Sequence, residues 1–170
     1  MSPAHSCRSV TCSTTSERAG NLSGLTHSYR GIEPSVSEFS WPVRVYYEDT
    51  DAGGVVYHAN YLRFMERART EWLRHKGFEQ DQLRDRDGIL FAVTRAKLDF
   101  LRPALFNQAL SVSACLTCCG RASLEIRQEV RGPGGEVCCR GELKLACLDA
   151  VRLRPRAIPE RLLAELSDVE

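Results

Sequence analysis

The chain has 170 residues, of which 43% are hydrophobic, and a formal net charge of +1 at neutral pH. This length favours one domain with a tail, and the hydrophobic share is enough for a core and too high for a disordered protein. The small net charge creates no overall field that would attract nucleic acid or a membrane surface, and no apolar run approaches the length of a membrane span.

Residues 1–38 are rich in Ser and Thr, contain Arg8, Arg18 and Arg30, and show no apolar periodicity. We expect a disordered N-terminal tail here and a folded domain over residues 39–170. The scarcity of acids leaves open a transit peptide, although no clear amphipathic helix supports it. A third interpretation is a start site assigned too early, with Val36 as the true beginning. Because we find no secretory signal core, we expect a cytoplasmic protein.

Residues 41–47 (WPVRVYY) predict a first strand, and a loop rich in acids and glycines follows from Glu48 to Tyr57. Residues 59–75 then predict a long helix, because apolar residues recur there at helical spacing. Gly77 is a natural C-terminal stop for this helix. At 1.5 Å per residue, the helix would be about 25 Å long, enough to cross a small domain.

A short second helix is predicted over residues 79–85, and the rest of the chain is typical of strands and turns. Four strands are expected, over residues 89–101, 109–118, 122–130 and 136–149. In the first of these, alternation predicts one face with Val93, Arg95 and Lys97 and another with Thr94, Ala96 and Leu98. A short C-terminal helix is expected within residues 158–166. Consecutive strands joined by short turns pair antiparallel, so we predict an α+β fold with one sheet covered by one helix.

Eight cysteines raise the question of disulfides or zinc. Without a secretion signal, we expect free thiols in a reducing compartment. Cys115 and Cys118 form a CxxC, and Cys138 and Cys139 form a second pair. Because neighbours at odd spacing on a strand point to opposite faces, buried thiols are favoured over a zinc site.

The loop before the long helix offers a chemical arrangement. The start of a helix presents unpaired N–H groups and a partial positive charge, and Gly53 and Gly54 permit close approach of the backbone to a ligand. An oxygen that gains negative charge would be stabilised there, while the carboxylate of Asp51 attacks a carbonyl or activates water. The alternative is ordinary, because acids before a helix are often caps and glycine pairs are often turns.

A resemblance favours the chemical interpretation. The stretch from Arg44 to Tyr61 reads RVYYEDTDAGGVVYHANY and resembles the signature of the 4-hydroxybenzoyl-CoA thioesterase family. The continuation ANYLRFMERARTEWLR, residues 59–74, resembles the branch of acyl-CoA thioesterases linked to the Tol-Pal envelope system. The likeness covers about residues 39–165. It implies a hot dog fold, in which an antiparallel five-stranded sheet wraps around one long central helix.

The resemblance also implies the reaction, the hydrolysis of an acyl-CoA thioester to a free acid and CoA. Asp51 matches the family's catalytic aspartate, as nucleophile or as general base, and the backbone N–H of His58 would polarise the thioester carbonyl. The imidazole of His58 is a second candidate for assistance. Tyr57, Asn60 and Gly54 would shape the substrate site. No metal or organic cofactor is implied.

Other charged residues have simpler interpretations. Asp49 is expected to cap or turn the chain, and Glu48 to be solvated. Some other hot dog thioesterases use a helix acid, but for Glu66 an ion pair with Arg63 or Arg67, or an interface contact, is favoured. The CoA phosphates need basic partners, and the candidates are Arg95, Lys97, Arg121, Arg127 and Arg131.

The resemblance further implies a homodimer with edge-to-edge sheets, or a homotetramer built from two such dimers. The acyl group is carried by CoA or by acyl carrier protein, and its length is open. Two alternatives remain. One is a dehydratase or hydratase of the same fold, against which the Asp51-to-His58 motif argues. The other is a non-catalytic acyl-CoA or acyl-carrier-protein binding protein.

Overall fold

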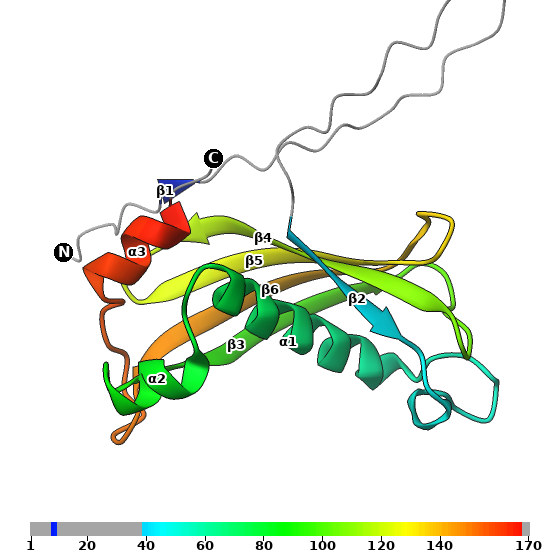
Figure 1. Cartoon of the computed structure of the whole chain (residues 1–170), viewed down its shortest axis with the longest axis horizontal. Coiled ribbons are helices and arrows are strands. Elements are labelled where there is room, and N and C mark those ends of the chain that lie inside the picture. Colours follow the sequence, from blue (N-terminus) through cyan, green and yellow to red (C-terminus); the bar gives the residue numbers. More distant parts are fainter. Residues whose placement is uncertain (1–7, 10–38, 168–170) are drawn as a thin grey trace, which may run out of the picture.

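One curved antiparallel sheet packs on one long helix in the computed structural model, which describes residues 8–9 and 39–167 (Figure 1). The strands are β1 Arg8–Ser9, β2 Phe39–Arg44, β3 Ile89–Phe100, β4 Ala109–Cys119, β5 Ser123–Arg131 and β6 Val137–Asp149. The helices are the 3-10 turn η1 Tyr47–Asp49, α1 His58–His75, α2 Gln80–Asp85 and α3 Glu160–Ser167. The predicted order of elements is confirmed.

The strand order explains how the sheet forms. β4 pairs with β5, β5 with β6 and β6 with β3, while β2 and the short β1 both pair with β4. All of these pairings are antiparallel. Apart from β1, the expected tail of residues 1–38 lies outside the described residues.

The first strand ends earlier than the predicted residue 47. At Tyr46 the chain turns into η1, because the backbone N–H of Tyr46 donates to Asp49 Oδ2 at 2.9 Å. A buried carboxylate thus turns a run of apolar residues out of the sheet, which periodicity alone does not reveal. Asp49 is 3% exposed, and its predicted turn role is confirmed.

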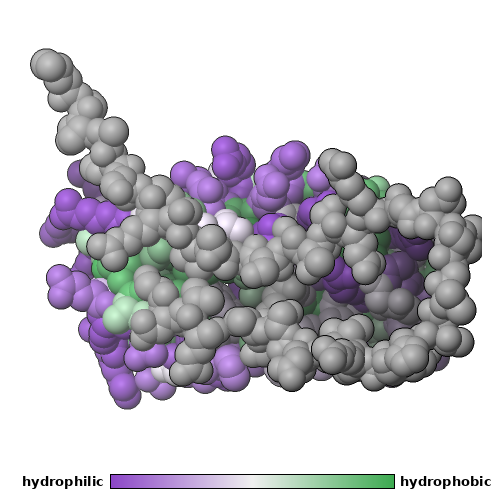
Figure 2. Space-filling model, turned by 90° about the horizontal axis from the view of Figure 1, so that it is seen from above, coloured by the Kyte–Doolittle hydropathy of each residue, from purple (hydrophilic) through white to green (hydrophobic). Residues whose placement is uncertain are grey.

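The core lies between α1 and the inner face of the sheet. Phe64, Met65 and Ala68 of α1 are fully buried, as are Val112 of β4 and Val130 of β5. The helix packs against β4, β2 and β5. Burying a side chain of the size of Phe or Met contributes about 1.5–3 kcal/mol, so this stripe accounts for much of the attachment of α1. Most charged side chains remain outside, with Asp49 and Arg69 as buried exceptions, and Figure 2 shows hydrophilic groups at the upper edge and the left end of the view.

β3 departs from its predicted faces. Its register with β6 shifts between Val93 and Arg95. Val93 pairs with Leu145 and Ala96 with Leu143, so Val93 shares the inner face with Ala96. The prediction that Val93 lies on the face of Arg95 and Lys97 is therefore wrong, because a bulge inserts one residue and inverts the alternation.

The cysteines are divided. Cys119, Cys138, Cys139 and Cys147 are free and buried, as predicted. Burial raises the pKa of the Cys139 thiol to about 12 and that of Cys147 to about 11, which keeps both protonated at neutral pH. Cys115 and Cys118 each take part in a disulfide bond, so the expectation of free thiols is wrong for these two.

The part of the chain that the structure describes has neither a candidate metal site nor a candidate membrane span. No group of three or more His, Cys, Asp or Glu side chains there could hold a metal ion. No helix among residues 39–167 is both long and apolar enough to cross a membrane.

Substitution of Gly141 should test the fit of α1 on the sheet. A Cβ at Gly141 would lie 2.8 Å from Sδ and 2.9 Å from Cε of the fully buried Met65. We expect Gly141→Ala to lower the free energy of unfolding by about 1–3 kcal/mol, as overpacking of a core does, measured by urea denaturation. Gly134→Ala is the control, because the added Cβ would meet only the side chain of Glu136. Equal stability of the two variants would contradict this packing.

Candidate active site

A tight turn shapes the loop between β2 and α1. The N–H of Asp51 donates to Val55 O at 3.0 Å, and the N–H of Gly54 donates to Asp51 O at 2.9 Å. Gly54 has a φ of 74°, a backbone conformation that favours glycine. Thr50 and Val56 form an antiparallel bridge across the turn. The turn therefore places Asp51 beside the segment that leads directly into α1.

The carbonyl of Asp49 fastens this loop to the start of α1. It accepts hydrogen bonds from the backbone N–H of Tyr57 and from Nδ2 of Asn60, each at 2.9 Å. Asn60 is 6% exposed. Because its amide is buried and donates to the protein backbone, Asn60 holds the loop in place. Its expected place in the substrate site stays a prediction.

Ala104, from the segment between β3 and β4, joins the same structure. Its carbonyl accepts the N–H of Val56 at 2.8 Å, and its own N–H donates to the hydroxyl of Tyr61 at 3.1 Å. Burial raises the pKa of this tyrosine, which keeps the hydroxyl neutral and able to accept. Sequence reasoning missed Ala104, because its contribution is made by the backbone and leaves no signal in the side chain.

The positive end of α1 lies at this loop, as Figure 1 shows beyond the end of β2. His58 is the first residue of the helix, and the N–H of Asn60 donates to Tyr57 O at 2.8 Å. The N–H groups of His58 and Ala59 have no carbonyl four residues earlier in the helix to bind. They are available to an oxygen that carries negative charge.

Aromatic rings surround His58. The ring centroids of Tyr57 and His58 are 4.3 Å apart, and those of His58 and Phe100 are 6.3 Å apart. Phe100 also meets Tyr61, with centroids 5.6 Å apart. Phe100, at the end of β3, was not named from the sequence, because 42 positions separate it from His58 and only the fold brings them together.

One chain leaves the site open. Asp51 and His58 are exposed, Tyr57 is 45% exposed and Phe100 is 53% exposed. Oδ1 of Asp51 accepts the N–H of Gly53 at 2.8 Å, which fixes the side chain over its own turn. The site is thus an open surface with one carboxylate, one helix end and the rings of Tyr57 and Phe100.

Two further acids can be placed. Glu48 is exposed, as expected. Glu66 is also exposed and accepts a hydrogen bond from the hydroxyl of Thr70 at 2.9 Å. The ion pairs found among the described residues do not include Glu66, so the predicted pairing with Arg63 or Arg67 is not formed in this structure.

The basic residues expected to bind CoA lie away from the site. The strand register places Arg95, Lys97, Arg127 and Arg131 on the outer face of the sheet, opposite α1. A hollow on that face is lined by both guanidinium and carboxylate groups, namely Arg95, Arg127, Glu125 and Glu142 together with Thr117, Ile126 and Leu143. Its charges offset one another. Arg121 follows the far end of β4, whose start is near the loop.

Comparison with known proteins identifies the family. Residues 45–166 match the thioesterase-like superfamily. The chain belongs to this superfamily. The acyl-CoA thioester hydrolase YbgC of Escherichia coli O6:H1 is 41% identical over 127 residues, covering 75% of this chain and 94% of that protein. The acyl-CoA thioesterase YbgC of Haemophilus influenzae is 40% identical over 126 residues, covering 74% and 92%.

A solved structure agrees with this family. A probable thioesterase from Bartonella henselae superposes with a TM-score of 0.69 at 31% identity, covering 72% of this chain and all of that one. The α+β hot dog fold predicted from the resemblance is confirmed by this match and by the sheet that packs on α1.

The role of Asn60 can be tested by stability. Asn60→Leu keeps much of the side-chain volume but leaves the Asp49 carbonyl without one of its two donors. We expect a loss of about 1–3 kcal/mol in the free energy of unfolding, and faster hydrogen exchange at the Tyr57 amide. The control is Gln80→Leu, which removes an exposed amide hydrogen bond to Thr70. Unchanged exchange at Tyr57 would contradict the role given to Asn60.

Proposed function

We infer that this protein is an acyl-CoA thioesterase, which uses water to split an acyl-CoA thioester into a free acid and CoA. The observation that carries this inference is the loop of Asp51 fastened to the start of α1 through the Asp49 carbonyl. Family membership and the named activities of the YbgC relatives support it.

The chemistry follows from the two ends of this arrangement. The thioester carbonyl oxygen accepts a hydrogen bond from the backbone N–H of His58. The start of the helix favours the negative charge that develops on this oxygen. The carboxylate of Asp51 then either attacks the carbonyl carbon or takes a proton from a water molecule that attacks it. If Asp51 attacks, breaking of the C–S bond leaves the acyl group on its carboxylate as an anhydride, and water then hydrolyses this anhydride to the free acid. If water attacks, breaking of the C–S bond gives the free acid directly. On both routes CoA leaves as its thiolate and takes up a proton.

The aromatic rings beside His58 suit the acyl portion of the substrate. Tyr57 and Phe100 present apolar faces next to the helix end, and Gly54 leaves open space, since no atom lies within 4 Å of a Cβ built there. We propose that these residues shape the substrate site. CoA and acyl carrier protein thioesters share the reacting group, so both belong in a substrate panel.

We also propose that the working form is a homodimer joined through β3. This strand lies at the edge of the sheet, and α1 packs against β2, β4 and β5. The short helix α2 contacts β3, and Ile89 is fully buried, but Val93 on the inner face of this strand is still 46% exposed. A second copy would cover this apolar face, pair with the open edge and enclose Asp51. A tetramer, a cytoplasmic location and the Tol-Pal association remain predictions from sequence and resemblance.

The role of Asp51 is tested by thiol release from a panel of acyl-CoAs. We expect Asp51→Asn to lower kcat/KM by at least about a hundredfold, because an amide neither attacks nor accepts a proton at neutral pH. Glu48→Gln, in the same loop and exposed, is the control and should retain most activity. An active Asp51→Asn variant would refute the role of this carboxylate. Absence of turnover in the wild type, with acyl-CoA still bound, would favour a binding protein.

His58→Ala separates the backbone of this residue from its imidazole. Because Ala also donates a backbone N–H at the first position of α1, the oxyanion contact should survive the change. If the imidazole assists, kcat should fall by about 10²–10⁴-fold, as loss of a general acid or base does. If kcat stays near wild type in the same thiol assay, only the backbone of His58 acts.

Dimer formation is tested by light scattering after size exclusion. Ala96→Asp places a charge on the inner face of β3, where Ala96 pairs with Leu143. We expect a shift from dimer to monomer and a parallel loss of activity, because burying an unpaired carboxylate at an interface is costly. Lys97→Ala, on the outer face of the same strand, is the control. An Ala96→Asp protein that stays dimeric would exclude this interface.

A further inference from the structure

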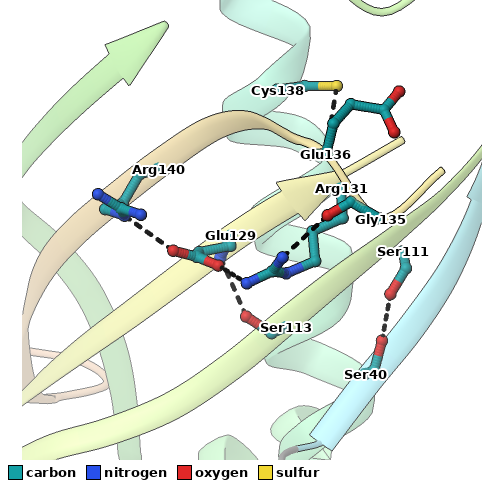
Figure 3. A network of polar contacts seen from close by, with 9 residues as sticks. All are labelled: Ser40, Ser111, Ser113, Glu129, Arg131, Gly135, Glu136, Cys138 and Arg140. Carbon is teal, nitrogen blue, oxygen red and sulfur yellow. Dashed lines mark hydrogen bonds and ion pairs between the residues drawn. The ribbon is translucent and has the colours of Figure 1, made fainter. Parts of the chain in front are cut away.

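The middle of the sheet has an unusual join between β4 and β5. Backbone pairing runs through Val112 and Val130 and resumes at Cys115 and Arg127. Between these pairs, side chains supply hydrogen bonds. The N–H of Glu129 donates to the hydroxyl of Ser113 at 3.0 Å, a contact drawn in Figure 3, and Nε2 of Gln128 donates to Ser113 O at 3.1 Å.

Gln128 also connects the sheet to the helix. It is 0% exposed and its side chain points to α1, where Nε2 donates to the backbone carbonyl of Met65 at 3.0 Å. Its Oε1 accepts Nη1 of Arg69 at 2.7 Å. Arg69 is 7% exposed, and it takes part in none of the ion pairs found among the described residues. Burial lowers the pKa of the Arg69 guanidinium, and the charge of Glu66 opposes this only in part. A buried guanidinium whose hydrogen bond goes to a neutral amide is costly for stability, which suggests a purpose other than stability.

Contacts of the neighbouring Glu129 on the outer face of the sheet determine the direction in which Gln128 points. The carboxylate of its neighbour Glu129 pairs with Arg140 on β6 at 2.8 Å and with Arg131 on β5 (Figure 3). The side chain of Glu129 is 14% exposed, so these contacts are partly shielded from water. With Glu129 held outward in this way, strand alternation directs Gln128 inward.

A hydrogen bond to a helix carbonyl constrains the position of the helix along the sheet, which apolar packing alone does not fix. Hydrophobic contacts are non-directional and tolerate small shifts of a helix along a sheet, whereas a hydrogen bond needs a defined distance and angle. Gln128 lies opposite Gly141 across β5 and β6, and the sulfur of Met65 occupies the space over Gly141. The same residue of α1 is therefore held at its backbone and at its side chain.

We propose that Gln128, together with Arg69, is a positioning residue that keeps the start of α1 aligned with the Asp51 loop, which is also anchored outside the helix by Val56 N–H to Ala104 O. Met65 is seven residues from His58, about 10 Å along a rigid helix. A shift of α1 on the sheet moves the N–H of His58 by a similar amount. This proposal rests on the proposed function, because such a shift would weaken the hydrogen bond from His58 N–H to the thioester carbonyl oxygen.

The test replaces the polar contact with apolar groups of similar size. In the double variant Arg69→Met with Gln128→Met, the fold should persist, because apolar replacement of a buried polar pair is often tolerated. We expect kcat to fall about 10- to 100-fold with little change in KM, as misplacement far from the chemistry does. Gln128→Glu, which still accepts from Arg69 but no longer donates to Met65 O when ionised, should lower kcat likewise.

Leu162→Ala is the control, since it removes a fully buried side chain of α3 and destabilises the protein away from α1. Its kcat should stay near wild type. The proposal is overturned if the folded double variant keeps wild-type kcat, if Leu162→Ala loses as much kcat, or if both Gln128 variants fail to fold.

Hydrogen exchange at the Tyr57 and Asn60 amides, which donate to Asp49 O and Tyr57 O at the start of α1, provides a second measurement that needs no turnover. Exchange should be altered in the double variant and unchanged in Leu162→Ala. If the wild type hydrolyses no thioester, the proposed function fails, while this exchange difference still decides whether Gln128 positions the helix.

Discussion

The site depends on one backbone carbonyl. The oxygen of Asp49 accepts the Tyr57 N–H and the Asn60 amide, and so joins the loop that carries Asp51 to the first turn of α1. An unsatisfied carbonyl buried at this point would cost free energy, so the two donors make one loop geometry strongly preferred. A carboxylate and a helix end thereby keep a fixed relation without touching each other. This fixed relation suits the proposed reaction, in which negative charge would develop on the thioester oxygen beside the helix end.

The exposure of the site has a structural reason. The single long helix covers only part of the sheet, and it leaves the inner face of β3 and the rings of Tyr57 and Phe100 partly open. Closing this surface with more chain would require another element. In the proposed homodimer, a second copy would close this surface without any additional element, and it would complete the sites of both subunits. The exposure of the inner face of β3 and the exposure of Asp51 would then have the same cause, the absence of the second subunit.

The interior of the sheet combines two kinds of contact. Most of α1 is held by apolar side chains, which supply the free energy of attachment, and a single amide from Gln128 reaches its backbone. The apolar contacts determine that the helix binds, and the directional contact determines where it binds. A protein that only needed stability would gain from an apolar residue at this position. A protein that must align a helix end with a carboxylate benefits from the amide.

The sequence by itself determined the order of elements, the acid and glycine loop before α1 and, through the resemblance, the family. These are local properties, because helical and strand periodicities and turn residues act over a few neighbours. Only the tertiary structure decided that Asn60 binds the loop, that Ala104 and Phe100 join the site, and that a bulge turns Val93 inward. Each of these depends on contacts between distant segments or on backbone atoms. The identity of a side chain does not encode these contacts, because the same type of residue can lie in a core, on a surface or in a site according to which segments the fold brings beside it.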